Sequence, residues 1–216
     1  SPYCIENERI SAISPKDDGS VTRARERFGV RSGCCCFLFC GKLIDKKQPL
    51  GLLEALKQAV RAGADAHLLI VGEGELRHEC DAFCRAHDLP VTFTGFLNQS
   101  EIGMAYSASD ALVLPSNDGE TWGLVVNEAF AAGLPALVSD KVGCHPDLID
   151  KSATGWVHRF GDWQQLSRQM IAAAEDVERL AEYGDNAKRR IQNYSPLHAA
   201  EGLLKAAAFV NQNSAR

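Results

Sequence analysis

The sequence contains no run of about 18 consecutive apolar residues, so it offers no segment of the length that a transmembrane helix needs. Its N-terminus also lacks the basic-then-apolar order of a secretory signal peptide. Together these absences predict a cytoplasmic chain. No stripe of lysine and arginine is visible, and the net charge is -5, which argues against non-specific binding of nucleic acid. Any anionic ligand must therefore be held by local groups.

Cysteine pairs at the CxxC spacing of structural zinc sites are also absent, although the chain has 8 cysteines. Several of them lie in the apolar run CCCFLFC, residues 34–40, where cysteine serves as a small hydrophobic residue of a buried strand. One expected helix carries a group of potential metal ligands, namely His78, Cys80, Cys84 and His87. A metal cluster there is the less favoured alternative, and we expect reduced thiols and no metal site.

Apolar strand-like runs alternate with helical periods along the chain. The expected strands lie at 34–40, 66–72, 91–95, 111–116, 135–139 and 155–158, and the expected helices between them at 48–63, 75–87, 100–108 and 123–132. From about residue 162 the pattern is helical to the end of the chain, whereas the proline-containing first twenty residues are typical of a linker. This alternation predicts an α/β fold with an open, doubly wound parallel sheet.

Two loops at the expected carboxyl ends of strands contain glycine. In FCGKLIDKKQP, Gly41 allows a close turn, and Lys42 and Lys47 could both reach an anion, although a solvated turn with lysines is an equal alternative. In IVGEGEL, Gly72 and Gly74 form only a GxG pair, and Arg77 stands where a dinucleotide-binding motif would have its next glycine. The second loop is therefore a weak signal.

The third loop, in GETWGLVVNEA, separates two glutamates that lie 8 residues apart. A helix is expected from Gly123 or Leu124 to Ala132, which places Glu120 in the loop and Glu128 within the helix. The start of this helix offers free N–H groups to a phosphate, while Glu120 can accept hydrogen bonds from hydroxyls and Glu128 from a hydroxyl pair such as that of a ribose. The alternative is that Glu120 only caps the helix and Glu128 is a surface residue.

The stretch PSNDGETWGLVVNEAFAAGLPALVSDKVG resembles the motif of the family-4 retaining glycosyltransferases, also called group 1, in which two glutamates flank a glycine-led helix. FLFCGKLIDKKQP resembles the diphosphate loop of that family, and LLIVGEGEL, VTFTGFL and TGWVHRFGD match in order. PYCIENERI resembles the segment that leads from the acceptor-binding half of these enzymes into the donor-binding half. The resemblance thus covers nearly the whole chain.

This resemblance implies one half of a GT-B fold, in which two Rossmann-like domains face each other across a cleft. Residues 1–30 would be a linker and connection from an N-terminal acceptor domain, residues 31–195 the nucleotide-sugar-binding domain, and residues 196–216 a C-terminal helix. The N-terminal acceptor domain of the same enzyme would be the partner of this chain.

The resemblance also assigns roles to residues. Lys42 and Lys47 would neutralise the diphosphate, and the amides of Gly123 and Leu124 would hold phosphate oxygens. Glu120 would bind the hydroxyls of the transferred sugar, Glu128 would bind the ribose, and the loop Gly95, Phe96 and Leu97 would lie along the base. Gly41, Thr121 and Trp122 complete the expected donor site, and the catalytic roles would belong to Glu120, Lys42 and Lys47. Lys42 replaces the more usual arginine of the family, Gln48 a glycine, and Thr121-Trp122 a small residue followed by phenylalanine.

The implied reaction is transfer of a glycosyl group, with retention, from a UDP-, GDP- or ADP-sugar to a glycan, lipid or other acceptor, without a cofactor or a metal bound by an Asp-x-Asp motif. The isolated chain would be inactive or weakly active, and it would lie in the cytoplasm or at the cytoplasmic face of a membrane, which the other half of the enzyme would contact. The alternative is a non-catalytic module that binds a nucleotide sugar or phosphosugar.

Overall fold

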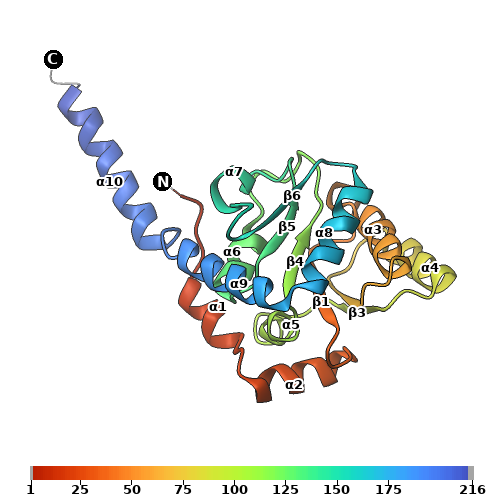
Figure 1. Ribbon diagram of the computed structural model, residues 1–216. Coiled ribbons are helices and arrows are strands. Elements are labelled where there is room, and N and C mark those ends of the chain that lie inside the picture. The colour runs from red at the N-terminus through yellow and green to blue at the C-terminus, as the bar shows by residue number, and fades with distance from the viewer. Residues whose placement is uncertain (1, 214–216) are drawn as a thin grey trace.

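The computed structural model describes residues 2–213 of the chain and contains a parallel six-stranded sheet in the order β3-β2-β1-β4-β5-β6 (Figure 1). The strands are β1 Cys35–Cys40, β2 Ala66–Val71, β3 Val91–Gly95, β4 Ala111–Leu114, β5 Ala136–Ser139 and β6 Gly155–His158. All pairings between neighbouring strands are parallel. The predicted open, doubly wound parallel sheet is therefore confirmed, with all of its strands at the expected places.

The helices between the strands also follow the predicted pattern. Between the strands lie α3 Pro49–Arg61, α4 Arg77–His87, α5 Ile102–Ala108 and α6 Leu124–Ala131, and after β6 come α8 Trp163–Glu175, α9 Val177–Ile191 and α10 Pro196–Asn213. Two short elements were not expected, the 3₁₀ turn η1 Asp45–Lys47 and α7 His145–Leu148. Neither is long enough to show a helical period in the sequence.

Alternate residues of the strands build two apolar cores, one on each face of the sheet. On β1, Cys36 and Leu38 pack with α2 (Asp18–Phe28), α5 and α6, whereas Phe37 and Phe39 pack with α3, α4 and α8. All 8 cysteines are free thiols. Burial raises the pKa of the Cys36 thiol to about 12, so this residue stays a neutral core side chain at physiological pH.

The N-terminal segment differs from the expected linker because it contains α1 Asn7–Ile13 and α2 Asp18–Phe28. The polar stretch SPKDDGS begins α2: the side chain of Asp17 accepts a hydrogen bond from the backbone N–H of Ser20 at 3.0 Å. Ile10 and Ala24 are both 1% exposed and belong to one of the cores. Turn-forming residues in this segment thus cap a helix rather than mark a flexible connection.

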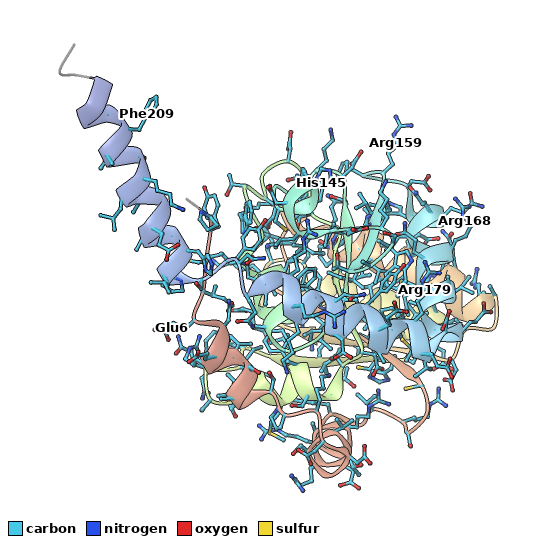
Figure 2. All side chains as sticks on the ribbon, turned by 60° about the vertical axis from the view of Figure 1, so that its left-hand side comes forward. Glu6, His145, Arg159, Arg168, Arg179 and Phe209 are labelled. Atoms are coloured by element: carbon cyan, nitrogen blue, oxygen red, sulfur yellow. The ribbon has the colours of Figure 1, made fainter. Side chains whose placement is uncertain are left out.

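The C-terminal part is helical, as expected, but it is divided into separate helices. Asp176 caps α9 by accepting a hydrogen bond from the backbone N–H of Arg179, and α10 then projects from the body of the molecule (Figure 1). Figure 2 shows Phe209 on this projecting helix, away from the sheet. Residues 214–216 of the expected C-terminal helix lie outside the described part. Among the helices of residues 2–213, none has the length and apolar character required to cross a membrane.

Candidate functional site

The candidate site lies where the order of the sheet reverses. β1 and β4 are neighbours, and the chain leaves β1 toward β2 on one side and β4 toward β5 on the other. In open α/β sheets, ligands bind beyond the carboxyl ends of the strands at such a point. The loops that follow β1 and β4 are those that contain Lys47 and Glu120, so the topology brings the first and third predicted loops together.

An ion pair joins these two loops. The Nζ atom of Lys47 donates to the Oε2 atom of Glu120, and the side chains are only 16% and 12% exposed. Lys46 Nζ lies 4.0 Å from the same oxygen, and its side chain is 40% exposed. The Lys47 stem passes close to Gly41, and a Cβ atom at position 41 would lie in ordinary van der Waals contact with it, 3.5 Å from Lys47 Cε. The glutamate therefore neutralises the lysine that the family resemblance assigned to a diphosphate.

The glycines after β2 have a structural explanation that the sequence left open. A Cβ atom on Gly72 would lie 2.0 Å from the carbonyl oxygen of Gly41, and one on Gly74 would lie 2.3 Å from that of Leu43. The backbone N–H of Leu43 donates to the Glu73 carbonyl at 3.0 Å. The GxG pair thus allows the β2 loop to support the Gly41–Lys47 loop at van der Waals distance.

Backbone contacts hold the loop after β4. Gly143 N–H donates to the carbonyl of Glu120 at 3.0 Å, and a Cβ atom at position 143 would lie 1.9 Å from the carbonyl oxygen of Thr121. Gly123 has φ 95° and precedes the first residue of α6. This left-handed conformation favours glycine, so the loop can turn directly into the helix and place its N-terminus beside Glu120.

The predicted donor residues of this loop form the wall of a pocket of about 330 Å³. Its lining consists of Tyr3, Lys47, Glu120, Thr121, Trp122, Gly123, Leu124 and Val125. The structure therefore brings together Lys47 of η1, the loop after β4 and the first residue of α6, which the sequence placed in one site. Glu120 is the only carboxylate among these lining residues, so the pocket itself offers no second acid for a pair.

Glu128 lies outside the lining of this pocket and makes a different contact. The hydroxyl of Tyr106 donates to its Oε2 atom at 2.6 Å. Tyr106 is fully buried, and burial, followed by the neighbouring Cys40 and Glu128, raises the pKa of its hydroxyl well above the usual value. The hydroxyl therefore remains protonated and holds one oxygen of Glu128 in place, while the side chain of Glu128 stays partly exposed.

The remaining predicted residues lie on the rim of the site. Lys42 is exposed on the loop after β1. Gly95, at the end of β3, has φ 72°, and its carbonyl accepts a hydrogen bond from Gly72 N–H at 2.9 Å. Phe96 is 79% exposed, and Leu97 is partly buried against the core. β3 is adjacent to neither β1 nor β4 in the sheet, and Gly95, Phe96 and Leu97 are absent from the lining of the pocket.

Three residues near the site were not singled out by the sequence. Tyr3 lines the pocket, although its segment was interpreted only as a connection. Asn127 is fully buried and accepts a hydrogen bond from Trp122 Nε1 at 2.8 Å. Lys46 lies beside Lys47 and faces the same glutamate. A buried asparagine inside an apolar helix was the one available sequence signal, because such an amide needs partners.

Another hollow, of about 490 Å³, lies at the opposite end of β1, against Cys34 and Cys35. Three of its charged groups have partners in the fold: Arg25 pairs with Asp110 at 2.6 Å, and Lys16 Nζ donates to the Tyr106 carbonyl at 2.8 Å. Within residues 2–213, no group of three or more histidine, cysteine, aspartate or glutamate side chains could hold a metal ion.

Comparison with known proteins gives one family match. The model described as "Glycosyl transferases group 1" matches residues 21–190. The chain is 30% identical to spore coat protein SA of Bacillus subtilis, over 90% of this chain and 55% of that protein. It is also 30% identical to D-inositol 3-phosphate glycosyltransferase of Rhodococcus erythropolis, over 98% of this chain and 51% of the relative. The chain thus spans about half the length of these curated relatives.

Solved structures agree in fold. The crystal structure of Anabaena Alr3699/HepE in complex with UDP matches with a TM-score of 0.81 and 20% identity, over 92% of this chain and 55% of that one. The C-terminal domain of LpcC, a glycosyl transferase group 1 family protein from Francisella tularensis, matches with a TM-score of 0.76 and 18% identity, over 89% of this chain and 99% of that one. At these identities the likeness establishes the fold alone.

Proposed function

Since this chain belongs to the group 1 glycosyltransferases, we propose that it is the donor-binding half of a retaining enzyme and that its pocket binds a nucleoside diphosphate sugar. The observation that carries the proposal is the meeting of Lys47 and Glu120 beside the N-terminus of α6 at the reversal of the sheet. Relatives support it, since they include a structure in complex with UDP-glucose and a GDP-mannose-dependent mannosyltransferase.

The charges of the site suit departure of a diphosphate. Lys47 would exchange Glu120 for the phosphate oxygens when donor binds, while Lys42 on the rim and the first amides of α6 add positive potential. These groups stabilise the negative charge that develops on the leaving diphosphate as the glycosidic bond breaks. Their arrangement therefore favours transfer chemistry that depends on binding and electrostatics.

Glu120 would bind hydroxyls of the transferred sugar rather than attack it. It is the only carboxylate among the pocket-lining residues, and it is already engaged in an ion pair with Lys47. A paired-carboxylate hydrolase needs two acids on opposite sides of the scissile bond. The lining of this pocket offers one, so we propose retention without a nucleophile from this half of the enzyme.

The acceptor site would belong to a further N-terminal domain, because the chain spans about half of its curated relatives. The acceptor, a glycan, lipid or other molecule, would approach across a cleft from that side. The 216-residue chain should accordingly bind donor and transfer little of it. Robust turnover by this chain alone, measured as release of nucleoside diphosphate in the presence of acceptors, would contradict the divided site.

Calorimetry with UDP, GDP and ADP and with their sugar derivatives tests the proposed ligand class. We expect one base to bind, both as the nucleoside diphosphate and as the sugar nucleotide, and thermal unfolding to shift upward with that ligand. Binding of none of the six compounds would contradict the proposed function. Binding without transfer by a longer protein that includes the N-terminal half would support the alternative of a non-catalytic binding module.

Substitutions of the two glutamates should affect different ligands. Glu128→Gln should weaken the nucleoside diphosphate and the sugar nucleotide alike, by about tenfold, because a lost charge-assisted bond to the ribose lies on their shared part. Glu120→Gln should spare the nucleoside diphosphate and weaken only the sugar nucleotide, since removal of its charge leaves Lys47 free for phosphate. Calorimetry of both variants with both ligands measures the difference. Identical effects of the two substitutions would show that the division of roles is wrong.

A further inference from the structure

The pocket contains one residue that comes from outside the strand-end loops. Tyr3 lies in the N-terminal segment, and its ring stacks on that of Trp122 with centroids 4.8 Å apart and an interplanar angle of 20°. It lines the pocket together with Lys47 and Glu120. Figure 1 shows the N-terminal segment near α6 and the start of α10, two helices that lie far from it in the sequence. The N-terminal segment therefore returns to the loop that the sequence assigned to the donor sugar.

Buried Asn127 on α6 fixes both partners of this stack. Its Oδ1 atom accepts a hydrogen bond from Trp122 Nε1 at 2.8 Å, and its Nδ2 atom donates to the carbonyl oxygen of Tyr3 at 3.2 Å. Asn127 is fully buried, so loss of either bond would leave a polar group without water to replace it. One amide thus sets the position of the indole and of the N-terminal backbone at the same time.

A second aromatic ring supports Trp122 from outside the pocket. The centroid of Tyr194, in the segment between α9 and α10, lies 6.2 Å from that of Trp122. Tyr194 borders a neighbouring hollow, which Tyr3 and Trp122 also line, and is absent from the lining of the donor pocket. Tyr3 and Tyr194 are therefore both neighbours of Trp122, but of the two only Tyr3 lines the proposed donor pocket.

We propose that Tyr3 is a specificity-determining residue that contacts the transferred sugar, and that Asn127 is its positioning residue. Tyr3 remains 56% exposed although it stacks on Trp122, so its ring has surface left for a ligand. A hexose carries C–H groups on its ring faces, and a rigid aromatic ring is a suitable apolar partner for them. The same pocket supplies Glu120 for hydroxyls. This inference rests on the proposed function, because the sugar must belong to a donor bound in this pocket.

The inference predicts a selective loss. Tyr3→Ala should weaken binding of the sugar nucleotide by about fivefold and leave the nucleoside diphosphate nearly unchanged, because Tyr3 lines the pocket with Glu120 and Thr121, whereas the base loop does not line it. Asn127→Ala should also weaken the sugar nucleotide relative to the nucleoside diphosphate, because it releases both the indole and the N-terminal segment. The quantity compared among the variants is therefore the ratio of these two affinities. Trp122→Phe keeps an aromatic partner for Tyr3 but removes the Nε1 hydrogen bond, and it tests this link if Asn127→Ala does not fold.

Tyr194→Ala is the matched control, since it also removes an aromatic neighbour of Trp122 but not a lining residue of the pocket. Calorimetry of each variant with the nucleoside diphosphate and its sugar derivative gives the ratio, and thermal unfolding reports structural damage separately. A purely structural role of Tyr3 would lower both affinities together. An unchanged ratio in Tyr3→Ala, or an equal change in Tyr194→Ala, would overturn the inference. If the unsubstituted chain binds neither ligand, the proposed function itself is wrong.

Discussion

Lys47→Ala should weaken binding of the nucleoside diphosphate by about 1.5 to 3 kcal/mol, a factor of roughly ten to 150. The substitution removes a charge-assisted hydrogen bond to phosphate. It also leaves Glu120, whose side chain is 12% exposed, without its closest cation and so places an uncompensated negative charge beside the diphosphate. Titration calorimetry at low and at physiological salt measures the loss, which should be larger at low salt.

Lys46→Ala is the matched control for this prediction. It removes a lysine from the neighbouring position of η1, but its Nζ atom lies 4.0 Å from Glu120 and its side chain is 40% exposed, so the loss should be smaller. Lys42→Ala should act in the same direction as Lys47→Ala, through the rim of the site. If neither Lys42→Ala nor Lys47→Ala changes the affinity, the assignment of this loop to the diphosphate is wrong.

Acidification from pH 7 to pH 4 should lower the free energy of unfolding by about 3 kcal/mol through His158 alone. His158 ends β6 and is fully buried, and neither ring nitrogen has a hydrogen-bond partner. Burial lowers its pKa from 6.5 to about 4, against the opposing charges of Asp140 and Asp162. Between these two values the unfolded chain binds a proton that the folded chain does not, so stability is full above pH 6.5 and falls as the pH decreases toward 4.

Urea unfolding of the wild type and of His158→Leu at several pH values between 4 and 7 tests this prediction. Leucine has a similar volume and loses no hydrogen bond, because the imidazole nitrogens make none. The variant should therefore have a flatter stability profile below pH 6.5. Subtracting the two profiles separates His158 from His67, whose pKa is also lowered by burial. Equal slopes in the two proteins would exclude a proton-free His158 in the folded state.

The main strands and helices were predictable because each has a hydrophobic pattern that is consistent along its whole length. In β1, apolar residues occupy both faces, which is typical of a strand buried in a parallel sheet. The N-terminal helices were missed because their signals resemble those of a linker: Asp17 and Gly29 are turn residues that here cap α2 at its two ends. Only the tertiary contacts of Ile10 and Ala24 distinguish a docked helix from a connection.

The sequence predicted which loops form the site, but it did not predict which side chains contact each other there. The motif identified Lys47 and Glu120 as residues of one site, but their ion pair depends on β1 and β4 being neighbours, which no local pattern states. Glu128 was assigned to a ribose, and its bond to Tyr106 comes from a helix packed on the same face of the sheet. Tyr3 lies far from the motif in the sequence, so its place in the pocket required the folded chain.

Gly143 has a consequence for how the surface of this protein can change. The residue is exposed, and an exposed position ordinarily accepts most side chains with little effect. Here any side chain would begin 1.9 Å from the carbonyl oxygen of Thr121, so it could be accommodated only by moving the backbone that carries Glu120 and Trp122. Although position 143 is exposed to solvent, it does not tolerate substitution. Sequence change in this outer loop is therefore restricted as strongly as it is in the core.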